Sequence, residues 1–366
     1  MAELTSRYQL GQLGPLMVDM AGMALTDQER DRLQHPMVGG LMLAARNYQS
    51  IEQLTALCDE IHHLRQPKLL IGVEQEGGRI QHFQSGFTHL PAMRDLGLVH
   101  DRHGRHPARR LAEQTGWVLA AELRACGVDF SLAPVLDVDH GSCGVIGNRA
   151  FHRQPAVVAE LAHALQMGMR RGGMHAVGKH FPGHGHVSDD VCHALPVDPR
   201  TLPEIEAEEL RVFRHMIDEG LAAIMPAHVI YPRVDSQAAC FSAIWLQEIL
   251  RDRLGFAGLI ISDDLGVIGA ASAGDMLRRV HAALDAGCDM VLICNQPAWV
   301  DHVLAHLNRP AQAVSLARFA RMHGRPCPSR VALREDAEFA LAIHEVGAVG
   351  LASAVLPFSP PDEASC

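Results

Sequence analysis

The segment that decides the fold runs from residue 259 to residue 294 and reads LIISDDLGVIGAASAGDMLRRVHAALDAGCDMVLIC. It starts with a short apolar run (259–262), passes through a polar loop into a stretch of helical period (273–286), and returns to a second apolar run (290–294). Gly287 follows the last helical residue, where glycine is the expected helix stop. A strand, a helix and a second strand in this order predict a parallel βαβ unit.

The same unit recurs toward the N-terminus. Uninterrupted apolar runs without alternation indicate parallel strands buried on both faces. Because eight such strands close a barrel and no GxGxxG motif follows the first, we expect an α/β fold of the (β/α)8 TIM type rather than an open doubly wound sheet. The predicted strands are 16–20, 39–43, 69–73, 130–133, 176–179, 223–225, 259–262 and 290–294, and the helices between them include 51–64, 108–126, 156–171, 202–219, 244–254 and 273–286.

Length and composition limit what the protein does. The chain has 366 residues, 48% hydrophobic and 20% charged, with a net charge of −10, which excludes general disorder and disfavours a nucleic-acid partner. We predict one catalytic domain over residues 1–352, extended by helices at 311–322 and 330–346, and a flexible tail over 353–366. The sequence shows no apolar run of about 18 residues, no signal peptide and no paired cysteine spacing, so we expect a cytoplasmic protein without a membrane partner.

Polar residues follow the predicted strands, and the carboxyl ends of barrel strands carry the active site. They occur after five consecutive strands, the third to the seventh, and therefore predict one pocket. Its candidates are Glu74, Gln75, Glu76, Arg79, Asp137, Asp139, His140, Asn148, Arg149, Lys179, His180, His228, Asp263 and Asp264.

The segment from Lys179 to His193 holds four histidines and two aspartates and leaves two interpretations open. His184 and His186 with an aspartate have the ligand types of a zinc site. Alternatively, the glycine-rich segment clamps a substrate and carries an acid/base group. Asp263 is likewise either a nucleophile at the barrel mouth or a helix cap.

Residues 179–185, Lys-His-Phe-Pro-Gly-His-Gly, resemble the signature of family 3 glycoside hydrolases, specifically the bacterial β-N-acetylglucosaminidases (β-N-acetylhexosaminidases) of peptidoglycan recycling. The resemblance covers roughly residues 14 to 300. Its further motifs are Gln75-Glu-Gly-Gly-Arg79, Leu132-Ala-Pro-Val-Leu-Asp137, Asn148-Arg-Ala-Phe151, Met225-Pro-Ala-His-Val-Ile-Tyr231, Ser262-Asp-Asp-Leu265 and Asp285-Ala-Gly-Cys-Asp289.

The resemblance implies a retaining exo-glycosidase that releases terminal N-acetylglucosamine from muropeptide-type fragments through a covalent glycosyl-enzyme. By position, Asp263 is the implied nucleophile. Arg149, Lys179 and His180, with Arg79 in the same subsite, are implied to bind the sugar. The family uses an Asp–His pair in the loop after the fifth strand as general acid/base, and it implies neither a metal nor a cofactor.

Three positions depart from the family pattern. The family reads Asp-x-His in the acid/base loop, whereas this chain has Asp190 followed by Val191, Cys192 and His193, so that the family's histidine falls on Cys192. Glu74 and His82 stand where the family has aspartate and arginine in the sugar subsite. We predict that the loop shifts by one residue, that His193 and Asp190 act as the acid/base pair, and that Glu74 and His82 still contact the sugar.

Two alternatives remain. The first is a family 3 relative with altered glycoside specificity or weakened acid/base catalysis, acting as a sugar-binding protein. The second is a metal-dependent hydrolase.

Overall fold

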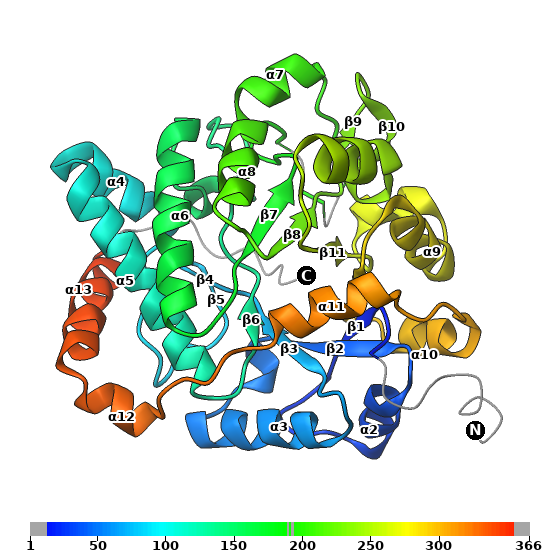
Figure 1. Ribbon diagram of the computed structural model, residues 1–366, viewed down its shortest axis with the longest axis horizontal. Helices are drawn as coiled ribbons and strands as arrows, with labels where there is room; N and C mark the ends of the chain where they lie inside the picture. The colour runs from blue at the N-terminus through cyan, green and yellow to red at the C-terminus, as the bar shows by residue number, and fades with distance from the viewer. Residues whose placement is uncertain (1–12, 189, 192–193, 355–366) are drawn as a thin grey trace.

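The computed structural model describes residues 13–188, 190–191 and 194–354, which fold around one eight-stranded parallel sheet. The strands occupy the middle of the molecule and the helices surround them (Figure 1). Apolar side chains from strands and helices form the core; Leu16, Ile71 and Ile261, for example, have no exposed surface. The predicted barrel is therefore confirmed.

The order of strands around the sheet is β6–β3–β2–β1–β12–β11–β8–β7. Its two ends are joined by residues that follow β6: the Val177 N–H donates to the Ala133 carbonyl at 2.8 Å, and the Lys179 N–H donates to the Pro134 carbonyl at 3.1 Å. These bonds nearly close the barrel. The strands of the sheet are β1 (Leu16–Asp19), β2 (Val38–Leu43), β3 (Leu70–Val73), β6 (Phe130–Ser131), β7 (Val177–Phe181), β8 (Ala223–Pro226), β11 (Leu259–Asp264) and β12 (Met290–Ile293).

Helices cover the barrel from outside and begin and end at recognisable residues. The Thr26 side chain accepts a hydrogen bond from the Glu29 N–H to start the helix α2 (Asp27–Gln34), and Gly287, at φ 122°, ends the helix before β12. The α-helices are α2 (Asp27–Gln34), α3 (Ile51–His63), α4 (Met93–His103), α5 (Arg105–Arg124), α6 (Pro155–Arg171), α7 (Leu202–Ala207), α8 (Glu209–Asp218), α9 (Met276–Ala286), α10 (Pro297–His306), α11 (Ala313–Met322), α12 (Arg330–Glu335) and α13 (Ala337–Ala354). Short 3₁₀ segments are η1 (Ala45–Asn47), η2 (Gly147–Arg149), η3 (Ala239–Phe241) and η5 (Ile268–Ala273), and η4 (Ile244–Arg253) is π-helical.

Two predicted helices are each divided in the structure. The stretch 202–219 forms α7 and α8, because Glu208 between them has a non-helical backbone (φ −119°, ψ −85°). The stretch 330–346 forms α12 and the longer α13, which are separated at Asp336. Helical periodicity continues across both breaks, so the sequence pattern alone did not reveal them.

Two short hairpins lie outside the main sheet. The hairpin of β4 (Gln75–Gly77) and β5 (Ile80–Gln81) follows β3 and turns through Gly77 and Gly78, whose φ angles are 116° and 55°. The second consists of β9 (Ile230–Tyr231) and β10 (Asp235–Ala238). The first hairpin matters for the site, because it carries Glu76.

Two further features concern cysteines and membranes. The seven described cysteines are free thiols, as their unpaired spacing predicted. Within the described ranges, no helix combines the length and the apolar character that crossing a bilayer requires. Most of the predicted tail, residues 355–366, lies outside the described residues.

Candidate active site

Charged side chains gather where the barrel strands end at their carboxyl termini. These side chains lie on, or in the segments that follow, β3, β6, β7, β8 and β11, which are neighbours around the barrel, so residues that follow different predicted strands come together in one cluster. The members are Glu74, Glu76, Asp137, Arg149, Lys179, His180, His228 and Asp263.

Two carboxylates and two cations form the densest part of this cluster. Lys179 Nζ lies 2.5 Å from both Glu74 Oε1 and Glu76 Oε1, and the Lys179 side chain is only 1% exposed. The Arg149 guanidinium donates two hydrogen bonds to Glu76, from Nε at 2.9 Å and from Nη2 at 2.7 Å. Arg149 Nη2 also lies 3.7 Å from Glu74 Oε1. Opposite charges thus compensate one another within a buried network.

The network keeps its carboxylates ionised. Burial acts to raise the pKa of Glu76. The positive charges of Arg149 and Lys179 outweigh this effect and hold the pKa well below its ordinary value. The same balance, with Lys179 as the strongest opposing charge, lowers the pKa of Glu74. Glu76 is 2% exposed, whereas the Glu74 side chain is 35% exposed. Glu74 is therefore the carboxylate of the pair that a ligand reaches.

Asp137 organises the next part of the pocket from a fully buried position. Its Oδ2 lies 2.7 Å from His180 Nδ1, and its Oδ1 accepts the backbone N–H of His184 at 2.7 Å. Burial acts to raise the pKa of Asp137, but His180 and these N–H donors lower it. A close approach fixes the backbone here, since a Cβ at Gly185 would lie 1.9 Å from the Val138 carbonyl oxygen. Asp137 thereby sets the direction of the His180 ring.

Asp263 is partly exposed at the end of β11, and its Oδ1 accepts the N–H of Asp264 at 2.8 Å. Burial acts to raise its pKa, but His228 and His180 outweigh burial, so the pKa of Asp263 is lowered. The His228 ring, itself fully buried, lies with Nε2 3.0 Å from the Asp264 carbonyl oxygen. An ionised, partly exposed carboxylate that two imidazoles influence electrostatically is suited to act as a nucleophile.

Asp264 differs from its neighbour. Its Oδ1 accepts the N–H groups of Gly266 at 2.8 Å and Cys294 at 3.1 Å, which ties β11 to the end of β12. Burial, together with the charges of Asp263 and Asp19, raises the pKa of Asp264 to about 7. These contacts give Asp264 a structural role.

Two predicted sugar-binding residues lie at the edge of the cluster. His82 Nε2 is 4.0 Å from Glu74 Oε2, and burial lowers the pKa of this imidazole. Arg79 is exposed and lies outside the carboxylate network, because its Nη2 donates to the Gly144 carbonyl at 3.1 Å and to that of Val145.

The acid/base loop is described only in part, and His193 lies outside the described residues. The carbonyl of Asp190 accepts the Ala194 N–H at 2.8 Å. The carbonyl of Val191 accepts the Gly269 N–H at 2.7 Å. Gly269 belongs to η5, and a Cβ at this position would lie 3.2 Å from the Val191 Cβ and 3.3 Å from the His228 Cβ, so this part of the loop lies beside His228.

The histidines that suggested a zinc site have other neighbours. His184 Nδ1 lies 3.6 Å from the Cys143 sulfur, and burial lowers the pKa of His184 to about 4. The His186 ring packs edge-on against His140 at 5.3 Å between centroids. Among the described residues, the groups with metal-binding geometry include neither His184 nor His186.

The structure shows what two pocket candidates do to which the sequence assigned no sugar-binding or catalytic role. Glu76 and Asp137 are the acids that hold Arg149, Lys179 and His180 in place. Both follow apolar strands in the sequence, and this position is what made them candidates for the pocket. What the pattern did not provide was which cation each acid contacts.

The sequence as a whole has recognisable relatives. Residues 5–321 match the family described as "Glycosyl hydrolase family 3 N terminal domain". The chain is 56% identical over 348 residues to a beta-hexosaminidase of Methylobacillus flagellatus, covering 95% of this chain and 99% of the relative. It is 55% identical to a beta-hexosaminidase of Thiobacillus denitrificans, covering 96% and 98% of the two chains.

Solved structures agree with these matches. NagZ from Neisseria gonorrhoeae in complex with N-trifluoroacetyl-D-glucosamine superimposes with a TM-score of 0.89 at 47% identity, covering 94% of this chain and 100% of that one. The zinc complex of the same protein gives a TM-score of 0.88 at 46% identity, with the same coverage.

Proposed function

Since the chain belongs to glycosyl hydrolase family 3, we propose that it is an exo-acting β-N-acetylglucosaminidase that cleaves with retention of anomeric configuration. One observation carries the proposal: the ionised, partly exposed Asp263 is close enough to His180 and Lys179 for their charges to lower its pKa, and Lys179 belongs to a compensated set of donors and acceptors suited to one sugar ring. The relative solved with N-trifluoroacetyl-D-glucosamine supports N-acetylglucosamine as the sugar.

In the first step, the Asp263 carboxylate attacks the anomeric carbon and the glycosidic bond breaks. Positive charge develops on the sugar as this bond lengthens, and the negative charge of Asp263 stabilises it. His228 keeps the Asp264 backbone in place, and the Asp264 N–H orients the attacking carboxylate. Water then cleaves the glycosyl-enzyme ester and regenerates Asp263.

Sugar recognition falls to the network opposite the nucleophile. The partly exposed Glu74 accepts hydrogen bonds from sugar hydroxyls, and His180 and His82 supply imidazole nitrogens. Lys179 and Arg149, buried behind Glu74, hold it in one geometry and provide positive charge. Arg79 contributes at the rim, beside the loop that contains Gly144.

Asp190 and His193 are the proposed acid/base pair, in which the histidine protonates the leaving oxygen and later activates water. The contact between the Val191 carbonyl and the Gly269 N–H supports this assignment, because it attaches the loop beside the segment that follows Asp263. We further propose that the natural substrates are muropeptide-type fragments in the cytoplasm and that no cofactor takes part.

A second candidate function rests on Cys192, which stands where the family has its acid/base histidine. If His193 does not replace that histidine, the chain binds N-acetylglucosamine and turns it over slowly or not at all. Loss of a general acid costs about 10²–10⁴-fold in rate.

A chromogenic β-N-acetylglucosaminide assay tests the proposal. Wild-type protein should release the chromophore, whereas Asp263→Ala should not, and chelator should leave the rate unchanged. Release no faster than with Asp263→Ala rejects the hydrolase. Calorimetric binding of N-acetylglucosamine in that case favours the sugar-binding alternative.

A further inference from the structure

Three groups of side chains in the described part of the chain place imidazole and carboxylate ligand atoms within 4.8 Å of one another. Histidine and carboxylate are ligands of Zn²⁺ and related divalent transition metals. Distances between the ligand atoms distinguish a group held by hydrogen bonds from a group open to a metal. The three groups are His100, Asp101 and His152; His140, Glu208 and Glu209; and His163, His215 and Glu219.

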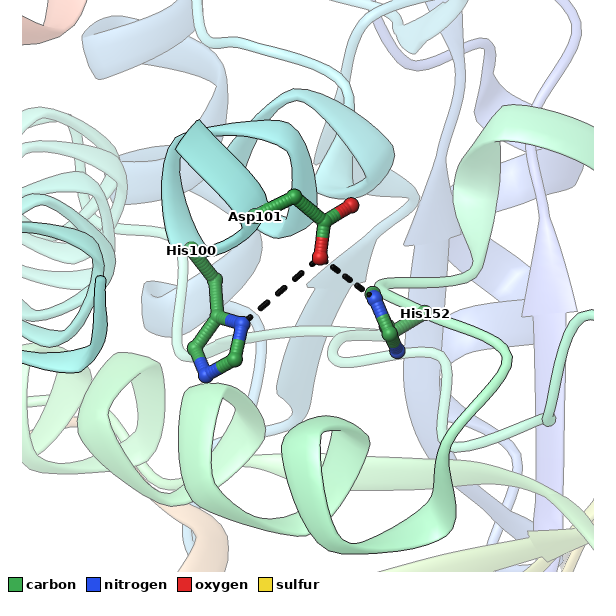
Figure 2. A group of neighbouring side chains, drawn as sticks. All are labelled: His100, Asp101 and His152. Atoms are coloured by element: carbon green, nitrogen blue, oxygen red, sulfur yellow. Dashed lines mark hydrogen bonds and ion pairs between the residues drawn. The ribbon is translucent and has the colours of Figure 1, made fainter. Parts of the chain in front are cut away.

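In the first group, hydrogen bonds already occupy the atoms of His152 and Asp101 that a metal would need as ligands. Figure 2 shows the Asp101 carboxylate between the two imidazoles, with His152 Nε2 2.8 Å from Asp101 Oδ1. His152 Nδ1 accepts the Gln154 N–H at 3.0 Å, so the single proton of the neutral ring sits on Nε2, facing Asp101. A metal on Nε2 would have to displace that proton. Arg94 also occupies the second carboxylate oxygen, at 3.0 Å.

The second group is an ion-pair cluster. Glu209 contacts His140 Nε2 and Arg200 Nη1, each at 2.8 Å, through its two oxygens. Glu208 lies 3.2 Å from the same guanidinium. The hydrogen bond to Glu209 raises the pKa of His140 and favours the protonated ring, which lacks a lone pair for a metal.

The third group has different distances. His163 Nε2 and Glu219 Oε2 are 3.5 Å apart, longer than a good hydrogen bond. With metal–ligand bonds of about 2.0–2.1 Å, two ligand atoms of a tetrahedral site are about 3.4 Å apart. The His163 and His215 rings lie 5.7 Å apart and nearly perpendicular, at 74°. Within the described part of the chain, no hydrogen bond engages either ring.

The backbone around this group is held in place without a metal. Helices α6 and α8 lie side by side (Figure 1), and His163 belongs to α6. Gln166 and Arg170, also from α6, donate to the Glu219 carbonyl at 3.0 Å and 2.9 Å. His215 and Glu219 are four residues apart at the end of α8, a spacing that places both on one helix face.

We propose that His163, His215 and Glu219 form a binding site for a divalent transition-metal ion such as Zn²⁺, with water completing the coordination. The site joins α6 to α8 just before β8 begins, at the end of the barrel opposite the pocket. A metal bound there strengthens the contact between these two helices without touching Asp263. The proposal does not depend on the glycosidase activity.

Thermal unfolding of the metal-free full chain with and without Zn²⁺ tests the site. At about a hundred times the dissociation constant, binding should raise Tm by about 3–5 °C, reversibly with EDTA. His215→Ala and the shape-preserving Glu219→Gln should each lose the shift. His100→Ala, which removes an imidazole from the first group, should keep it.

Anomalous scattering at the zinc edge locates the ion in crystals grown with Zn²⁺. The expected result is a peak between the three side chains. The proposal is overturned if Glu219→Gln retains the full Tm shift, or if zinc appears only elsewhere, such as at the catalytic pocket or the His302–His306 pair on α10.

Discussion

Replacing Glu76 by glutamine should destabilise the protein strongly, although the two side chains have nearly the same shape. Glu76 is 2% exposed and accepts three charge-assisted contacts, two from Arg149 at 2.9 and 2.7 Å and one from Lys179 at 2.5 Å. The glutamine amide is neutral and cannot compensate the charges of the two buried cations. Its NH2 group also presents N–H donors to them, where the carboxylate offered an acceptor.

The structure sets the expected size of the effect. Removing one partner from a buried ion pair costs about 3–5 kcal/mol, because a charge remains buried without compensation. Glu74 still faces Lys179 at 2.5 Å and Arg149 at 3.7 Å, so the lower end of this range applies. We expect Glu76→Gln to lose about 3 kcal/mol of unfolding free energy, or about 4 °C in Tm.

Urea unfolding of wild type, Glu76→Gln and a matched control measures this loss. Asp301→Asn is the control, since Asp301 also holds an arginine, Arg32, through two contacts but is 45% exposed. Exposed pairs contribute at most about 1 kcal/mol. If the two variants lose stability within 1 kcal/mol of each other, Glu76 does not compensate the two buried cations as its contacts indicate.

The difference in unfolding free energy between wild type and Glu76→Gln should also depend on pH. Because the folded state lowers the pKa of Glu76, its contribution is present above the unfolded value of about 4.3 and is lost as pH falls toward the folded value. The stability gap between wild type and Glu76→Gln should therefore be full near pH 7 and narrow below about pH 4. A gap independent of pH contradicts the assignment of charge to Glu76.

Three further changes test other parts of the pocket. Arg149→Lys replaces a two-pronged guanidinium by a single ammonium, so steady-state kinetics should show KM raised about tenfold with a smaller change in kcat; an unchanged KM removes Arg149 from sugar binding. His193→Ala should lower kcat by about 10²–10⁴-fold, and an unchanged rate assigns acid/base catalysis to another group. Asp264, with its pKa raised to about 7, binds a proton that the unfolded chain releases above about pH 4. Wild type should therefore lose stability relative to Asp264→Asn as pH rises from about 4 to 7. Urea midpoints of the two proteins that change by the same amount across that range would contradict this prediction.

The barrel could be predicted because its strands are buried on both faces. Continuous apolar runs such as 69–73 and 290–294 have few alternatives in a chain of this length, and all eight predicted strands are present. The helix breaks were harder to predict from the sequence. Glu208, for example, departs from helical geometry although it is neither glycine nor proline. The β4–β5 hairpin was missed because its strands are only three and two residues long.

The site was predictable in position and less so in its contacts. Strand ends located Glu74, Lys179 and Asp263, since parallel strands bring their carboxyl ends together. The partners of each charge depend on side-chain geometry between segments far apart in sequence, such as the 73 residues between Glu76 and Arg149. Strand position therefore identifies which acids enter the pocket, and only the fold determines which cations they hold.

Mass spectrometry of the intact protein, trapped with a slowly hydrolysed fluorinated N-acetylglucosaminide, shows directly whether Asp263 forms the covalent glycosyl-enzyme. We expect a covalent adduct of one sugar, located by peptide mapping to Asp263 and missing in Asp263→Ala. An adduct on another carboxylate, or hydrolysis of the sugar with no adduct at any time, contradicts this expectation.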